Sequence, residues 1–237
     1  MTRTQTVSYK NIGDREYMDK QYKTVYQGGV GEIIEKKSRF IATVIPCEDE
    51  ETALAFIEAT KKKYWDARHN CSAYTVGLNH ELERCSDDGE PQKTAGRPML
   101  DVLLNEGIHN VCVVVTRYFG GVLLGTGGLV RAYQAAVKAG LENSTVITKQ
   151  FGKKIQIVTD YNGIGKIQYL VATGGYTMLS TDYTDVVTAC VLVTPAEQDG
   201  FIKKVTEATS GRADISVKEE LWFADVDGEV LLFEENR

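Results

Sequence analysis

The segment from Val111 to Gly140 constrains the fold most, because it passes from an apolar run through a glycine-rich loop into a helical pattern. The run VCVVVT is short and bounded by turn signals, which predicts a buried strand. The pattern LVRAYQAAVKAG predicts a helix that ends at Gly140. Five glycines fall within the nine positions from Gly120 to Gly128. The segment therefore predicts a strand, then a tight glycine loop, then the start of a helix.

The residues before this segment alternate between strand and helix patterns. The stretch from Gly31 to Cys47 predicts two strands around a charged bend. An acidic start after Cys47 predicts a helix that runs to Lys61–Lys63, since acidic side chains complement the amino end of a helix. The string HNCSAYTVGL predicts a strand, ERCSDDGEPQKTAG a polar loop and PMLDVLLNEG a helix.

The residues after this segment follow a different order. From Lys153 to Phe223 the patterns are strand, helix, strand, strand, helix, strand. That order is the ferredoxin-like arrangement, an antiparallel sheet with both helices on one face. The polar junction at residues 143–150 predicts a domain boundary, so we expect an α+β protein of two domains.

A chain of 237 residues is long enough for two small domains. The expected segments are a polar tail over residues 1–17, an N-terminal α/β domain over 18–143, a ferredoxin-like domain over 148–223 and a C-terminal tail over 224–237. Met18 is an alternative start to Met1.

Composition narrows the classes of function. The chain is 43% apolar and 25% charged, as in ordinary soluble globular proteins. No run approaches the roughly 18 apolar residues of a membrane helix, so we expect no membrane partner. The net charge of −6 argues against indiscriminate DNA binding and leaves room for a local basic patch. Five cysteines without a CxxC motif indicate reduced thiols in a cytoplasmic protein, and we expect no cofactor and no metal.

The glycine loop has two interpretations, close packing of the strand on the helix and contact with an anion. Backbone amides that open a helix can point at a phosphate. Arg117 beside two aromatic residues can pair with a phosphate while a ring stacks on a base. The residues assigned to this nucleic-acid or anion site are Lys93, Arg97, Arg117, Tyr118, Phe119, Gly120, Gly121, Gly125, Gly127, Gly128 and Arg131.

A second cluster suggests chemistry, although the structural interpretation is favoured. On a strand, His69 and Cys71 share a face, which is compatible with a nucleophile or a metal site. The acids Asp87, Asp88 and Glu90 lie in a polar turn and could bind Mg²⁺, but an EF-hand loop would need more acids at alternate positions, so a solvated turn is favoured. We assign no catalytic residue and expect a protein that is not an enzyme.

The chain resembles the IMPACT family, also called YigZ or uncharacterised protein family 0029. The string GRPMLDVLLNEGIHNVCVVVTRYFGGVLLG, from Gly96 to Gly125, resembles the family signature along its whole length, and HNCSAY and SDDGEP resemble its other characteristic segments. The part after the junction resembles a domain of unknown function in bacterial members. One departure is Gln92-Lys93, where a small residue or glycine is expected, so Lys93 would supply charge there.

The resemblance implies a fold for each domain and a role in translation. It implies an N-terminal domain similar to a ribosomal-protein domain and to domain IV of elongation factor G, and a C-terminal domain similar to domain V of that factor. Eukaryotic relatives are linked to translational control through an amino-acid-starvation kinase, using an extra domain without counterpart here, so that role is not transferred. We expect a non-enzymatic RNA- or ribosome-binding protein that regulates translation. One alternative is a hydrolase-type or metal-dependent enzyme that uses His69 and Cys71 or the Asp87-Asp88-Glu90 loop. The other is a protein-interaction adaptor, with a protein of the translation apparatus as a partner.

Overall fold

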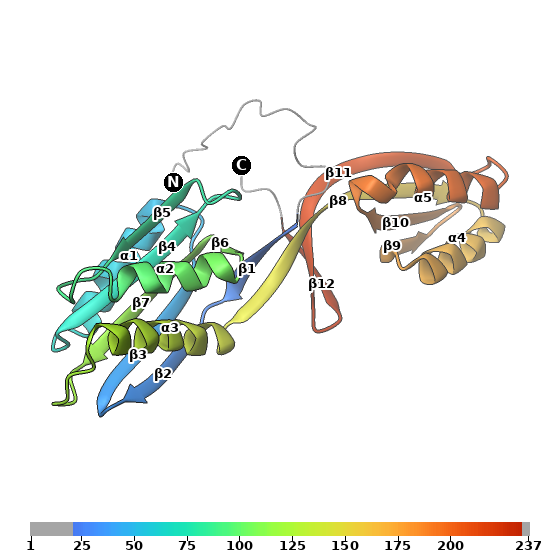
Figure 1. Cartoon of the computed structure of the whole chain (residues 1–237). Coiled ribbons are helices and arrows are strands. Elements are labelled where there is room, and N and C mark those ends of the chain that lie inside the picture. Colours follow the sequence, from blue (N-terminus) through green and yellow to red (C-terminus); the bar gives the residue numbers. More distant parts are fainter. Residues whose placement is uncertain (1–20, 234–237) are drawn as a thin grey trace, which may run out of the picture. The chain divides into compact units, whose positions relative to one another are not determined.

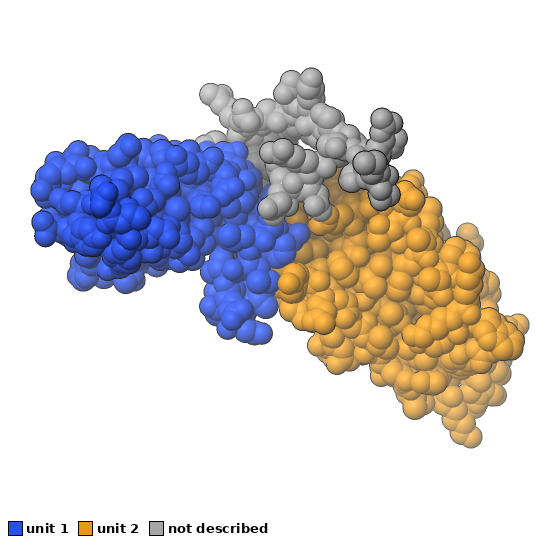
Figure 2. All heavy atoms as spheres, turned by 180° about the vertical axis from the view of Figure 1, so that it is seen from behind, with its two compact units in different colours: residues 1–21, 149–237 blue, residues 22–148 orange. Residues whose placement is uncertain are grey.

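A computed structural model describes residues 21–233 of the chain (Figure 1). The expected tail over residues 1–17, the alternative starts and residues 234–237 lie outside the described residues. The chain forms two compact units, one of residues 22–148 and one that contains residues 149–233 (Figure 2). The division falls inside strand β8 (Thr145–Thr159).

The unit of residues 22–148 is built on a five-stranded antiparallel sheet. The strands lie in the order β2-β3-β7-β4-β5. They are β2 (Val30–Glu35), β3 (Ser38–Pro46), β4 (His69–Val76), β5 (Leu82–Ser86) and β7 (Val111–Tyr118). Strands β1 (Gln21–Gln27) and β6 (Ile108–His109) pair with each other in parallel. Strand β5 corrects the sequence analysis, which places its residues in a polar loop.

Helices cover both faces of this sheet. Helix α1 (Glu50–Lys63) packs on one face, whereas α2 (Gly96–Asn105) and α3 (Thr126–Glu142) lie side by side on the other (Figure 1). Along β7, Cys112 and Val114 pack with the core under α1, and the alternate residues Val113 and Val115 pack under α2 and α3. Because both faces of β7 are covered, its sequence is continuously apolar instead of alternating.

Strand β2 and helix α3 approach each other closely at Gly31. A Cβ added to Gly31 would collide with the backbone of Ala139 and Gly140. Glycine is therefore required there, because only a residue without a side chain lets the two backbones meet.

The second unit has the expected βαββαβ order. Its elements are β8, α4 (Tyr161–Gly174), β9 (Thr177–Tyr183), β10 (Val187–Val193), α5 (Pro195–Ala208) and β11 (Asp214–Val226). The strands lie antiparallel in the order β9-β10-β8-β11. Residues of both helices, among them Ile167 and Phe201, pack on one face of the sheet around Ile155 and Val191. The α+β class and the ferredoxin-like order are confirmed.

The expected C-terminal tail is wrong for residues 224–233. Strand β11 continues to Val226 and pairs with β12 (Glu229–Phe233) across a hairpin. Asp227 and Gly228 form the turn, and both have positive φ angles, 54° and 86°. An Asp-Gly pair is a strong hairpin signal because both turn residues adopt positive φ. None of the helices within residues 21–233 is long and apolar enough to cross a membrane.

Candidate nucleic-acid interface

Three connections between elements lie at the same end of the strands of the five-stranded sheet. Strand register places Arg39 opposite Tyr118 and His69 opposite Arg117, so β3 and β4 begin where β7 ends. The β2–β3 turn, the β5–α2 loop and the β7–α3 loop therefore gather there. We call this region the loop end, and it consists of residues 36–37, 87–95 and 119–128. The Gly120 amide donates a hydrogen bond to Ser38 Oγ at 3.1 Å, which ties two of the three connections together.

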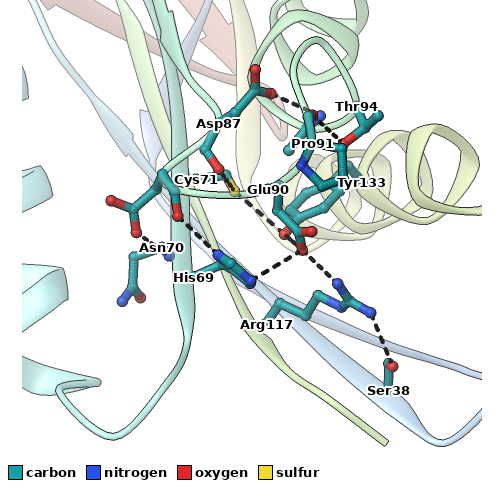
Figure 3. Close-up of polar contacts among 12 residues, drawn as sticks. Ser38, His69, Asn70, Cys71, Asp87, Glu90, Pro91, Thr94, Arg117 and Tyr133 are labelled. Carbon is teal, nitrogen blue, oxygen red and sulfur yellow. Dashed lines mark hydrogen bonds and ion pairs between the residues drawn. The ribbon is translucent and has the colours of Figure 1, made fainter. Parts of the chain in front are cut away.

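A buried ion pair lies beneath the loop end (Figure 3). Arg117 Nη1 lies 2.6 Å from Glu90 Oε1, and the two side chains are only 8% and 3% exposed. The Tyr133 hydroxyl donates to the same oxygen at 2.9 Å. Burial raises the pKa of Tyr133, as do the nearby Cys71 and Glu90, so this hydroxyl stays protonated and can donate. The pair joins the β5–α2 loop to the end of β7.

The prediction that Arg117 faces outward is wrong. Side chains alternate along a strand, so Arg117 points to the same face of β7 as Val113 and Val115. This is the face that α2 and α3 cover. Its Cζ lies 5.4 Å from the Phe40 ring centre and 5.7 Å from that of Phe119. The guanidinium is paired within the chain and does not face a polyanion.

The second predicted cluster, His69 and Cys71 with the acids of the β5–α2 loop, is brought together by hydrogen bonds within the unit. His69 Nδ1 lies 2.8 Å from the Asp88 carbonyl oxygen, and its Nε2 lies 4.0 Å from Glu90 Oε1. The Cys71 thiol donates to the Asp87 carbonyl at 3.0 Å and lies 3.3 Å from the Tyr133 hydroxyl. These contacts hold the β5–α2 loop against β4.

The two aspartates of this loop bind backbone amides. The Asp87 carboxylate accepts hydrogen bonds of 2.7–3.0 Å from the amides of Lys93, Ala95 and Gly96, which caps the start of α2. Asp88 accepts from the Asn70 amide at 2.7 Å and pairs with Lys61 at 3.2 Å. Within residues 21–233, no group of three or more His, Cys, Asp or Glu side chains is arranged to hold a metal ion.

The environment of Cys71 opposes nucleophilic chemistry. A thiol nucleophile requires a lowered pKa, since the thiolate is the reactive form. Burial raises the pKa of Cys71 well above its usual range, and the negative charges of Glu90, Asp88 and Asp87 raise it further. The Cys71 thiol is therefore protonated at neutral pH and acts as a hydrogen-bond donor inside the unit.

Raising the pH above about 8.5 is expected to lower the free energy of unfolding. Burial raises the pKa values of Cys71 and Cys112 in the folded chain. Between the unfolded and folded pKa values only the folded state keeps these protons. The contribution of these two thiols to the free energy of unfolding is therefore complete below about pH 8.5. Above that pH it falls by about 1.4 kcal/mol per pH unit for each thiol. Denaturant titrations in reducing buffer between about pH 7.5 and 9.5 measure this slope.

The matched comparison is the double variant Cys71→Ala/Cys112→Ala, which should show a much flatter dependence of stability on pH. Cys47, whose pKa burial raises to about 11, and Cys85, whose pKa burial also raises, remain in that variant and contribute to the residual slope. A double variant with the wild-type slope would contradict this account.

The β7–α3 loop presents open backbone amides. Gly125, at φ 74°, is the N-cap residue of α3, and as a glycine it supplies no side-chain hydrogen bond to cap this helix. The amides of the first helical turn have no intrahelical partner because of helix geometry. Gly125, Thr126 and Gly127 are exposed, and Gly128 is half-buried. The predicted anion-binding amides are therefore accessible.

The predicted side chains of the site differ in exposure and pairing. Lys93 and Arg131 are exposed, whereas Arg97 pairs with Asp101 at 2.7 Å. Tyr118 is half-buried and donates to Asp66 at 2.9 Å. Phe119 is 49% exposed.

Comparison with known proteins identifies the family. Residues 36–141 match the Impact N-terminal domain, and residues 157–212 match a domain of unknown function, DUF1949. IMPACT family member YvyE of Bacillus subtilis (strain 168) is 40% identical over 194 residues, covering 82% of this chain and 89% of that relative. The chain belongs to the IMPACT family.

Two further comparisons span most of this IMPACT family chain. IMPACT family member YigZ of Escherichia coli (strain K12) is 35% identical over 187 residues, covering 78% of this chain and 92% of that relative. A crystal structure described as that of "an hypothetical protein" is 32% identical, with a TM-score of 0.53, covering 84% of this chain and 98% of that one. The resemblance found in the sequence is thereby confirmed.

Sequence reasoning missed three exposed residues of this IMPACT family loop end. Lys36 and Lys37 form the β2–β3 turn with φ angles of 43° and 67°, and both are exposed. Leu123, in the β7–α3 loop, is 83% exposed. The sequence signal for these residues was the pair of lysines at the bend between two predicted strands. The pair is relevant to the site only because the fold brings this bend beside the glycine loop.

Proposed function

We propose that this IMPACT family chain is a non-enzymatic, cytoplasmic RNA- or ribosome-binding protein that acts in translation. The observation that carries the proposal is that the loop end combines exposed cations with the open backbone amides at the start of α3. Lysine and arginine side chains and helix amino ends are the groups that bind nucleic-acid phosphates. The loop end thus offers the chemistry that a phosphate backbone requires.

The balance of charge at the loop end supports the same conclusion. Glu90 is paired with the buried Arg117, and Asp87 is bound to backbone amides. Lys36 and Lys37 are exposed, and neither forms an ion pair with another described residue. Lys93 of the loop end, and Arg131 further along α3, are likewise exposed and without an ion pair to any residue of the described range. A local positive surface can therefore exist on a chain of net charge −6.

The buried polar cluster explains why RNA binding is preferred to the enzymatic alternative. A catalytic site needs side chains that reach a substrate. Here Cys71 and Glu90 are buried, and both lie within hydrogen-bond distance of the Tyr133 hydroxyl. Cys71 also donates to the Asp87 carbonyl, and Glu90 also accepts from Arg117. They act as an internal brace for the loops that carry the exposed groups.

The translational setting rests on the family resemblance. The likeness of the N-terminal domain to domains of a ribosomal protein and of elongation factor G supports ribosomal RNA, or a partner in the translation apparatus, as the target. Likeness of fold is an analogy and does not itself assign function, so the proposal is tested by identifying the bound RNA directly.

Ultraviolet crosslinking in cell extract tests the proposal. Ribosomal RNA should be recovered with the chain above a mock purification, and the crosslinked peptides should contain residues 36–37 or 119–131. Arg117→Ala is unsuitable as the negative control, because it would leave Glu90 buried and unpaired. Absence of RNA, or crosslinks confined to α4 and α5, would refute the proposal.

A further inference from the structure

The Phe119 ring is supported from inside the unit by a cation. Arg117 Cζ lies 5.7 Å from the Phe119 ring centre and 5.4 Å from that of the fully buried Phe40. A guanidinium at this distance attracts the ring face through its quadrupole. The buried arginine therefore links an interior ring to a surface ring.

The supporting guanidinium is itself fixed. Arg117 Nη1 pairs with Glu90 at 2.6 Å, and Nη2 lies 3.5 Å from Ser38 Oγ. Glu90 in turn accepts from Tyr133 of α3. Groups from β3, the β5–α2 loop and α3 thus hold the arginine in one position.

The backbone after Phe119 is fixed as well. The Gly120 amide donates to Ser38 Oγ at 3.1 Å. A Cβ added to Gly120 would collide with the Lys37 backbone, so the chain passes directly over the β2–β3 turn. Phe119 is consequently held both through its ring and through the residue that follows it.

A fixed aromatic ring at the surface has a specific use. Phe119 is 49% exposed although Arg117 lies over one face of its ring, and the exposed Lys36 and Lys37 form the β2–β3 turn, against which the next residue, Gly120, packs. Exposed aromatic rings beside cations are the means by which proteins bind unpaired bases, because every base has a π-face that stacks. A pre-positioned ring loses little conformational freedom on binding.

We propose that Phe119 stacks on an unpaired base, so that the target class of the loop end is single-stranded or looped RNA rather than continuous duplex. The inference rests on the proposed RNA binding and specifies its substrate. In an A-form duplex the bases are stacked on one another, so their faces are closed to a side chain. The open amides of Gly127 and Gly128 and the lysines of the β2–β3 turn then bind the phosphates on either side of the stacked base.

The test compares RNA binding by variants of Phe119. Fluorescence anisotropy measures the affinity of the full chain for a single-stranded RNA of about 12 nucleotides and for a duplex of the same length. Phe119→Ala and Phe119→Leu should weaken single-strand binding about 5- to 100-fold and leave duplex binding nearly unchanged. Phe119→Trp should restore single-strand binding, and added RNA should quench its fluorescence more than that of the wild type, which already contains Trp65 and Trp222. Tyr169→Ala, which removes an exposed ring from α4, is the matched control and should bind like wild type.

The outcomes separate this inference from the proposed function. If Phe119→Ala and Phe119→Leu bind the single strand as wild type does, while binding still weakens with salt, stacking is refuted and phosphate binding stands. Equal affinity of the wild type for single strand and duplex also refutes the inference. If the wild type binds neither RNA at about 50 mM salt, both proposals fail together. Thermal unfolding of each variant shows whether the fold is retained.

Discussion

Replacing Glu90 with Ala is expected to lower the free energy of unfolding by about 3–5 kcal/mol. The substitution leaves the Arg117 guanidinium buried without its counter-charge, because the Arg117 side chain is 8% exposed. It also removes the acceptor of the Tyr133 hydroxyl, which lies 2.9 Å from the carboxylate. Removing one partner of a buried pair is far more costly than the pair's net contribution, since the remaining charge stays desolvated.

Denaturant unfolding of purified variants measures this effect. Glu32→Ala is the matched control, because it breaks an ion pair in which Arg39 Nε lies 2.8 Å from Glu32 Oε1 and both side chains are exposed. The control should lose about 1 kcal/mol or less. Glu90→Gln should lie between the two, since it keeps an acceptor and loses the charge. A loss in Glu90→Ala no greater than in Glu32→Ala would contradict the brace described for the loop end.

The double variant Lys36→Glu/Lys37→Glu is expected to weaken binding of single-stranded RNA by about 10- to 100-fold at low salt. Each lysine that contacts a phosphate releases a counterion, and for single strands each contact contributes about −0.7 to the slope of log K against log salt. The slope of the double variant should therefore be shallower by about 1.4. Anisotropy titrations over a series of salt concentrations give both quantities.

The control for this charge reversal is Lys203→Glu/Lys218→Glu, which makes the same change of net charge at exposed positions on α5 and β11. It should retain most of the wild-type affinity and slope. An equal loss in both double variants would show that net charge, and not the loop end, governs binding.

The sequence predicted the elements whose signals are local. The apolar run at Val111 is a strand buried on both faces, and the helix after the glycine loop begins at Thr126. The βαββαβ order was readable because each of its strands and helices is bounded by its own turn or cap residues, such as Asp160 before α4 and Thr194 before α5. Such boundaries depend on neighbours within a few residues.

Features set by distant residues were not predictable in this way. The prediction that Arg117 faces outward rested on its neighbours Tyr118 and Phe119. Its ion-pair partner, Glu90, lies 27 residues earlier in the sequence, and only the folded chain brings the two side chains together. Arg117 lies two residues after Val115 on the predicted strand, so it shares a face with Val113 and Val115, and this spacing was the available signal for its burial. Lys36 and Lys37 lie far from the glycine loop in sequence, and only the pairing of β3 with β7 brings the two loops together.

The central claim is that the loop end is the surface that binds RNA. Its most direct test is a titration of the ¹⁵N-labelled chain with single-stranded RNA, followed by the amide resonances in NMR spectra. The account predicts that shifts concentrate at residues 36–37 and 119–128 and leave α4 and α5 unchanged. Shifts confined to the unit of residues 149–233, or none at about 50 mM salt, would contradict it.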